Sequence, residues 1–119
     1  MPPNAIDATV AVPACEAAAK VAPEDRRILF QLGRAYYAAN DFAKAHEQYE
    51  RADALGSPLA TTNLGVLYEN GRGVPADLAK AQQLYGKAAA ARVAIAMSNL
   101  GWMYESGRTA SNFWALQSP

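Results

Sequence analysis

Two side chains of the sequence could act as a nucleophile or as a strong metal ligand, and each occurs once. Cys15 is the only cysteine and His46 the only histidine among the 119 residues. A single cysteine excludes an internal disulfide framework and a cysteine-based zinc cluster, and the histidine has no second ligand beside it. We therefore expect no metal site and no cofactor. Cys15 is interpreted as a small buried hydrophobe and His46 as an exposed helix residue.

Catalysis is not expected from the remaining residues. The segment Gly-Arg-Gly-Val at residues 71–74 could suggest a phosphate-binding loop, but the glycine-lysine-serine pattern and the preceding strand are missing. It is interpreted as a turn. Elsewhere, no nucleophile stands beside a general base, so the sequence predicts a protein that is not an enzyme.

The charge balance and the start of the chain limit the classes of partner. Eleven Lys and Arg balance eleven Asp and Glu, so no net field favours nucleic acid or an anionic membrane. The first fifteen residues lack a basic start with a clean apolar run, and no stretch of about 18 apolar residues occurs. We expect no membrane partner and favour the cytoplasm; the periplasm stays open if a signal precedes this sequence.

A repeated phrase sets the organisation of the chain. Residues 63–72, NLGVLYENGR, return as NLGWMYESGR at residues 99–108, 36 positions later, and Tyr49 and Tyr85 keep the same spacing. The frame Leu-Gly-x-x-Tyr occurs a third time at residues 32–36. Alanine carries much of the 51% hydrophobic content, which favours close-packed helices. The sequence therefore predicts an all-α protein built from pairs of helices, an A helix and a B helix joined by a turn.

Small residues and caps support this division. Glycine inside a helix costs about 1 kcal/mol relative to alanine, so its repetition at Gly33, Gly65 and Gly101 predicts close approach of neighbouring helices. The repeated tyrosines are predicted to be core residues; they are Tyr36, Tyr49, Tyr68, Tyr85 and Tyr104. Asp41 and Asp77 are expected to cap the B helices, and Gly56 followed by Ser57 and Pro58 is expected to separate one pair from the next.

The first pair resembles the tetratricopeptide repeat, through Leu29, Leu32, Gly33, Tyr36, Ala45, Tyr49 and Ala52. The second pair resembles the related Sel-one-like repeat, a family common in bacteria, through Gly71, Gly73, Val74, Asp77, Lys80, Ala81, Tyr85, Ala88 and Ala89. The resemblance implies an α-α superhelix, or solenoid, over residues 11–108. We divide the chain into a half repeat at 10–22, repeats at 24–56 and 57–92, a partial repeat at 93–108 and a divergent tail or cap at 109–119.

The resemblance also implies a non-catalytic scaffold that binds a peptide or a partner protein on the concave face of its A helices. Helical spacing gives the candidate partner-binding residues, which are Arg27, Phe30, Arg34, Tyr37, Val66, Glu69, Trp102 and Glu105, with Thr62 and Ser98 on the same stripe. Arg34, Tyr37 and Trp102 are of the types that most often carry binding energy.

Two alternatives remain open. Cysteine-rich relatives that bind or hydrolyse β-lactams carry a cysteine pair in each repeat, a pattern that Cys15 alone does not match. The chain could instead be a fragment or end-cap of a larger repeat protein, because a B helix after residue 108 is missing. The segment Ser111–Gln117 could replace that helix; if it does not, the exposed end predicts a homodimer through the C-terminal end.

Overall fold

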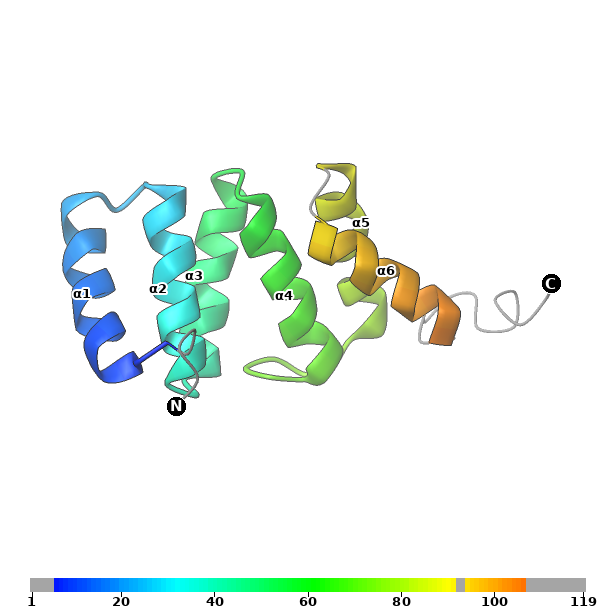
Figure 1. Ribbon diagram of the computed structural model, residues 1–119, viewed down its shortest axis with the longest axis horizontal. Coiled ribbons are helices and arrows are strands. Elements are labelled where there is room, and N and C mark those ends of the chain that lie inside the picture. Colours follow the sequence, from blue (N-terminus) through cyan, green and yellow to red (C-terminus); the bar gives the residue numbers. More distant parts are fainter. Residues whose placement is uncertain (1–5, 92–93, 107–119) are drawn as a thin grey trace.

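Six helices follow one another in the computed structural model, which describes residues 6–91 and 94–106 (Figure 1). Side chains at positions 94–96, 98, 105 and 106 lie outside that description. The helices are α1 (Ala8–Val21), α2 (Arg26–Ala38), α3 (Phe42–Ala54), α4 (Pro58–Asn70), α5 (Leu78–Ala90) and α6 (Ala94–Ser106). No strand occurs in the two described ranges. The predicted all-α class is confirmed.

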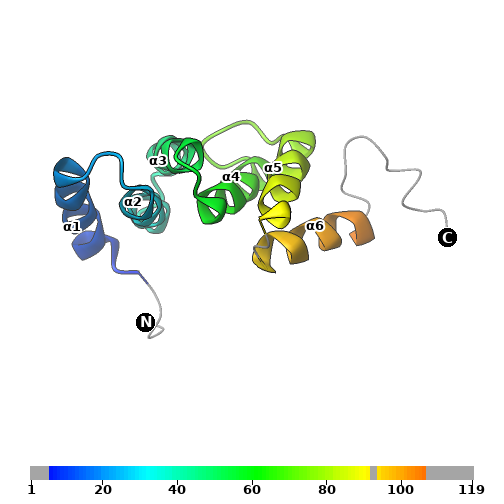
Figure 2. The same ribbon diagram turned by 90° about the horizontal axis from the view of Figure 1, so that it is seen from above.

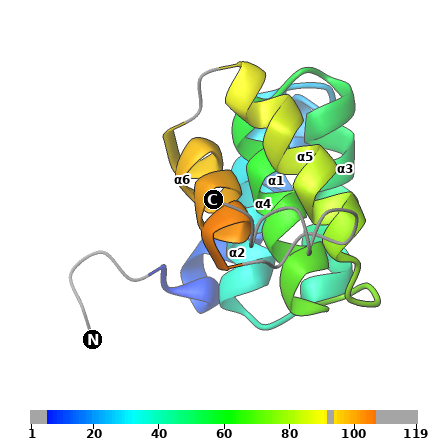
Figure 3. The same cartoon turned by 90° about the vertical axis from the view of Figure 1, so that its right-hand side faces the viewer.

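The helices form an elongated array. The extensive contacts join each helix to the next one in the chain, and the molecule measures 51 × 30 × 26 Å. Seen from above, α2, α4 and α6 lie toward one side and α3 and α5 toward the other (Figure 2). The view along the array separates α6 from α3 and α5 in the same way (Figure 3). This is the predicted α-α superhelix, with α2, α4 and α6 as A helices and α1, α3 and α5 as B helices; the repeat boundaries themselves remain a prediction.

Short polar side chains begin the helices where the sequence predicted caps. The carboxylates of Asp41 and Asp77 accept the backbone amides of Lys44 and Lys80, which are otherwise unpaired in a first helical turn. Ser57 caps α4 in the same way and is followed by a proline in the first turn. Gly56 separates α3 from α4 with φ of 89°, a left-handed conformation that other residues rarely adopt. The predicted caps and this glycine break are confirmed.

Two of the repeated helix glycines, Gly33 and Gly65, leave space for a tyrosine ring. A Cβ added to Gly33 would lie 2.5 Å from Cε1 of Tyr49, and one added to Gly65 would lie 2.5 Å from Cε1 of Tyr85. Each ring comes from the B helix of the same pair and is almost fully buried. The close approach predicted from the glycines is therefore confirmed at two positions. At the third, Gly101, an added Cβ would meet nothing within 4 Å.

The repeated tyrosines separate into a buried group and an exposed one. Tyr36, Tyr49 and Tyr85 belong to the core, and Tyr68 is partly buried against it. Tyr104 is 39% exposed, so its assignment to the core was wrong. The reason is its position: α6 is the last helix of the described chain, and no further described helix covers its outer side.

The long turn between α4 and α5 packs against the preceding pair. Gly73, with φ of 75°, approaches the start of α3 so closely that an added Cβ would lie 2.5 Å from the carbonyl oxygen of Phe42. Arg72 places its guanidinium 5.6 Å from the ring centre of Tyr37 and 5.3 Å from that of Phe42, and it donates a hydrogen bond to the Tyr37 hydroxyl. The turn therefore links two helix pairs through cation–π contacts.

The only histidine lies between helices instead of on the surface. The imidazole of His46 is 18% exposed, and its Nε2 lies 3.1 Å from the hydroxyl oxygen of Tyr68 and 3.0 Å from Oε1 of Glu50. The predicted exposure was wrong because α4 brings Tyr68 onto this face of α3. Cys15 is partly buried and packs against the core, close to the interpretation of a small apolar residue.

Candidate binding groove

A hollow of about 340 Å³ opens on the side of the A helices. Its walls come from α2 and α4, and its floor includes a tyrosine of α3 that lies behind them. The lining residues are Ile6, Arg34, Tyr37, Ala38, Tyr49, Asn63 and Val66. The hollow thus joins two aromatic rings and three aliphatic side chains to one cation and one carboxamide. Clefts of this size and mixture are typical of sites that bind ligands.

The glycine of the first pair explains why a core tyrosine reaches the floor. Tyr49 packs its ring against Gly33, where any side chain would block it. Its hydroxyl accepts a hydrogen bond of 3.2 Å from Nδ2 of Asn63 on α4. Burial raises the pKa of Tyr49 to about 12, while the Asn63 bond and the charge of Arg34 act in the opposite direction. The phenol is therefore neutral at physiological pH and serves as a polar anchor under the hollow.

Two of the predicted residues form the rim on the α2 side. Arg34 is partly exposed and bonds the side chain of Gln31 at 3.2 Å, with its guanidinium carbon 5.9 Å from the ring centre of Phe30. Phe30 itself packs toward the core, its ring centre 6.0 Å from that of Tyr49. Tyr37 is held edge-on against Phe42 at 5.1 Å. The aromatic side of the hollow is thus fixed by packing before any partner arrives.

The second pair contributes Val66, and Glu69 lies one turn further along α4. Val66 is partly buried and lines the hollow opposite Arg34. The carboxylate of Glu69 accepts a 2.8 Å hydrogen bond from the hydroxyl of Tyr85, so it also supports the inner packing of the second pair. Thr62 is 2% exposed, and its hydroxyl donates to the carbonyl oxygen of Pro58. Its assignment to the stripe was therefore wrong, and Asn63, the next residue, faces the hollow instead.

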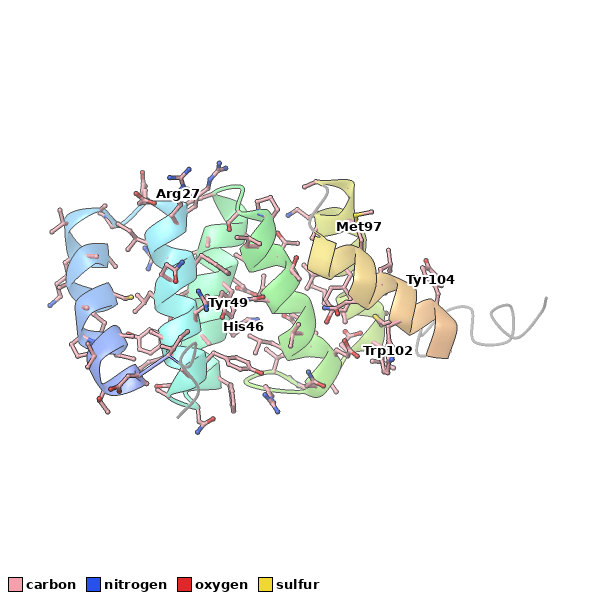
Figure 4. The ribbon with its side chains drawn as sticks, viewed as in Figure 1. Arg27, His46, Tyr49, Met97, Trp102 and Tyr104 are labelled. Carbon is pink, nitrogen blue, oxygen red and sulfur yellow. The ribbon has the colours of Figure 1, made fainter. Side chains whose placement is uncertain are left out.

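The other predicted residues do not line this hollow. Arg27 lies at the far end of α2 and borders a separate hollow of about 300 Å³ beside Cys15 (Figure 4). Trp102 is 48% exposed on α6, where it and Tyr104 point to different sides of the helix (Figure 4). Glu105 belongs to α6, and its side chain and that of Ser98 lie outside the described part. The structure brings together Arg34, Tyr37 and Val66, with Phe30 in contact with Arg34 and Tyr49, whereas Glu69 bonds Tyr85 of the second pair.

Four residues that line the hollow were not among the predicted binding residues; they are Ile6, Ala38, Tyr49 and Asn63. Asn63 stands three positions before Val66, so helical spacing alone could have selected it in place of Thr62. Ile6 precedes the first helix and has no position in the repeat, so no periodic signal points to it. Tyr49 was assigned to the core, which its 2% exposure confirms, and the repeat pattern does not show that its buried ring also lies beneath the hollow.

Other kinds of site receive no support from the described residues. In this part of the chain no group of three or more His, Cys, Asp or Glu side chains is arranged to hold a metal ion. Among the same helices, none combines the length and the apolar character that a membrane span requires. The hollow between α2 and α4 is therefore the candidate binding site of the described chain.

Comparison with protein families agrees with the geometry of the second half of the chain. The family described as Sel1 repeat matches residues 58–92 and 94–112, which include α4, α5 and α6. Residues 58–92 and 94–112 are therefore similar to Sel1 repeats, and the helical-repeat fold is consistent with that family. A search of curated proteins finds no match to it. Sel1 repeats are generally protein-interaction modules and are typically non-catalytic.

Proposed function

We propose that this protein, whose second half is similar to Sel1 repeats, binds an extended peptide or an exposed segment of a partner protein on the concave face of its A helices. The observation that carries the proposal is the hollow of about 340 Å³ between α2 and α4, with Arg34 and Val66 on its two sides. These positions are equivalent in the repeat, so each pair adds one residue to the same surface. Successive pairs of a solenoid extend such a surface along the array.

The chemistry of the hollow suits a segment with both apolar and polar groups. Tyrosine and arginine contribute most to binding where they are held rigidly and lose water on contact. Tyr37 is fixed by Phe42 and Arg72, and Arg34 is steadied by Phe30 and Gln31. Little side-chain entropy is therefore lost when a partner binds.

The proposed surface continues beyond the hollow. Phe30 and Glu69 extend it along α2 and α4, and Trp102 and Glu105 would extend it onto α6. Arg27 borders a separate hollow at the other end of α2, which makes it useful as a control. The homodimer through the C-terminal end remains a separate prediction, which light scattering of the purified chain tests.

A peptide selection on the purified protein tests the binding face. Peptides selected from a random library are measured against the wild type and against Arg34→Glu and Val66→Glu, with the helical signal checked for each variant. We expect affinity to fall at least about tenfold for both, because each places a carboxylate in the hollow. Arg27→Glu makes the same change of charge on the same helix and should alter affinity less than about twofold.

Trp102→Ala then shows whether the surface reaches α6, with a loss of affinity expected for peptides long enough to span both pairs. If the selected peptides bind all four variants as tightly as they bind the wild type, the proposed binding face on the A helices is wrong. Failure to select any peptide would count against peptide recognition itself.

A further inference from the structure

The hollow has a wall that does not belong to any repeat. Ile6 lines it together with residues of α2, α3 and α4, although it stands before the first helix. Asp7, which follows, has an extended backbone with φ of −83° and ψ of 100°, and its carboxylate caps α1 by accepting the amide of Thr9. Figure 2 shows the chain entering α1 from the side on which the A helices lie. The cap thus directs the preceding residue toward the hollow.

Packing of α1 does not require this position of Ile6. The first helix contacts the core through Val12, Cys15 and Ala19, which lie along its length and not at its start. Ile6 is only partly buried, and about 340 Å³ of space remains beside it. An aliphatic side chain that faces an open, largely apolar hollow is available for contact with a ligand.

We propose that Ile6 is a specificity-determining residue, which turns an open groove into a pocket for one large apolar side chain of an extended partner. The side chain would lie between Ile6 and Val66, with the rings of Tyr37 and Tyr49 around it. The inference rests on the proposed function for its biological meaning, but the pocket can be tested without any partner.

The residues that line the hollow indicate that the partner's side chain is apolar. Five of the seven lining residues are aliphatic or aromatic, and the amide nitrogen of Asn63 is already bonded to the Tyr49 hydroxyl. Arg34 is directed toward Gln31 and Phe30 at the rim. No carboxylate is among the lining residues, so a cationic side chain at the centre would lose water without gaining a paired group, whereas an apolar one gains from burial.

The probe is N-acetyl-leucine methylamide, titrated into the full chain while the methyl signals of Ile6 and Val66 are followed by NMR. We expect saturable shifts of both in the millimolar range, and no such shifts with the alanine or lysine analogues. Ile6→Ser should weaken binding about fivefold, judged by the Val66 signals, and Ile6→Val should retain it. Val10→Ser is the matched control, because Val10 is 65% exposed on α1 and does not line the hollow.

Equal binding of the leucine probe by wild type and Ile6→Ser would overturn the proposal. Tighter binding by Ile6→Ser would also overturn it, because the Ile6 side chain would then compete with the probe for the hollow. Absence of shifts with the leucine probe would also overturn it. The same variants are then measured with the selected peptides. Peptides that depend on Arg34 and Val66 but not on Ile6 would leave the proposed function standing and remove only this inference.

Discussion

The helix pairs α2–α3 and α4–α5 and the last A helix, α6, carry the same repeated glycine and tyrosine, but these residues are packed differently. In α2 with α3, and in α4 with α5, the glycine of the A helix receives a tyrosine ring at a distance that admits no side chain. In α6 the corresponding Gly101 has open space, and Tyr104 is exposed. The repeated A-helix sequence therefore supplies only one partner of this contact, the glycine. The other partner is the tyrosine of the B helix that follows, so the contact is buried only where both helices of a pair are present.

Removal of the two kinds of tyrosine should give the largest difference between these regions. Tyr85 is fully buried, so Tyr85→Ala should lower the free energy of unfolding by about 3–5 kcal/mol, through lost burial and the cavity left behind. Tyr104→Ala should cost less than about 1 kcal/mol, because much of that ring already faces solvent. Urea unfolding followed by circular dichroism measures both. Similar losses for the two variants would show that Tyr104 is as well packed as Tyr85.

High pH should also lower the stability of the helix pair formed by α2 and α3. The folded pKa of Tyr49 is about 12, above the ordinary value of 10.0, because burial disfavours the phenolate. Below pH 10 the phenol is protonated in both states and contributes no pH dependence. Between pH 10 and 12 the unfolded chain loses the proton first, so the free energy of unfolding should fall by roughly 2–3 kcal/mol.

Urea unfolding at pH 9 and pH 12 measures this fall, and Tyr49→Phe separates it from the titration of other groups. The phenylalanine variant cannot ionise at this position and should lose less stability over the same range. Tyr36 acts in the same direction, since burial and its bond to Glu16 raise its pKa to about 12. Parallel pH curves for wild type and Tyr49→Phe would contradict the assignment.

The glycines themselves give a smaller effect of opposite sign in the two regions. Gly65→Ala would place a methyl group 2.5 Å from the buried Tyr85 ring and should cost about 1–3 kcal/mol. Gly101→Ala meets nothing within 4 Å and should stabilise the chain by up to about 1 kcal/mol, because alanine favours the helix. Thermal melts of the two variants measure the contrast. A destabilised Gly101→Ala would mean that this glycine also receives a neighbouring group.

Much of the fold could be predicted from the sequence because the signals are local or periodic. A cap such as Asp41 depends on the residues of one helical turn, and the pairing of Gly65 with Tyr85 repeats that of Gly33 with Tyr49. The exposure of Tyr104 could not be read in this way. Its residue type matches Tyr68, and only the absence of a following described helix distinguishes the two.

The candidate site was less predictable, for a geometric reason. A shift of one residue around a helix changes the direction of a side chain by about 100°, which separates the buried Thr62 from Asn63 in the hollow. Arg27 and Arg34 lie on one face of α2, yet the ends of that helix border different hollows. The position of Ile6 depends on how the chain enters α1, and no periodic pattern carries that information.

The smallest expected effect concerns the polar contacts that join an A-helix tyrosine to the preceding B helix. His46 and Gln82 are 36 positions apart, and they bond the hydroxyls of Tyr68 and Tyr104 at 3.1 and 3.0 Å. His46→Ala should cost about 1 kcal/mol because its contact is partly buried, and Gln82→Ala less than about 0.5 kcal/mol because its contact is exposed. His46→Gln, which copies the residue of the other pair, should restore most of the loss. Urea unfolding measures all three variants; if His46→Gln were as unstable as His46→Ala, imidazole packing rather than the hydrogen bond would join α3 to α4.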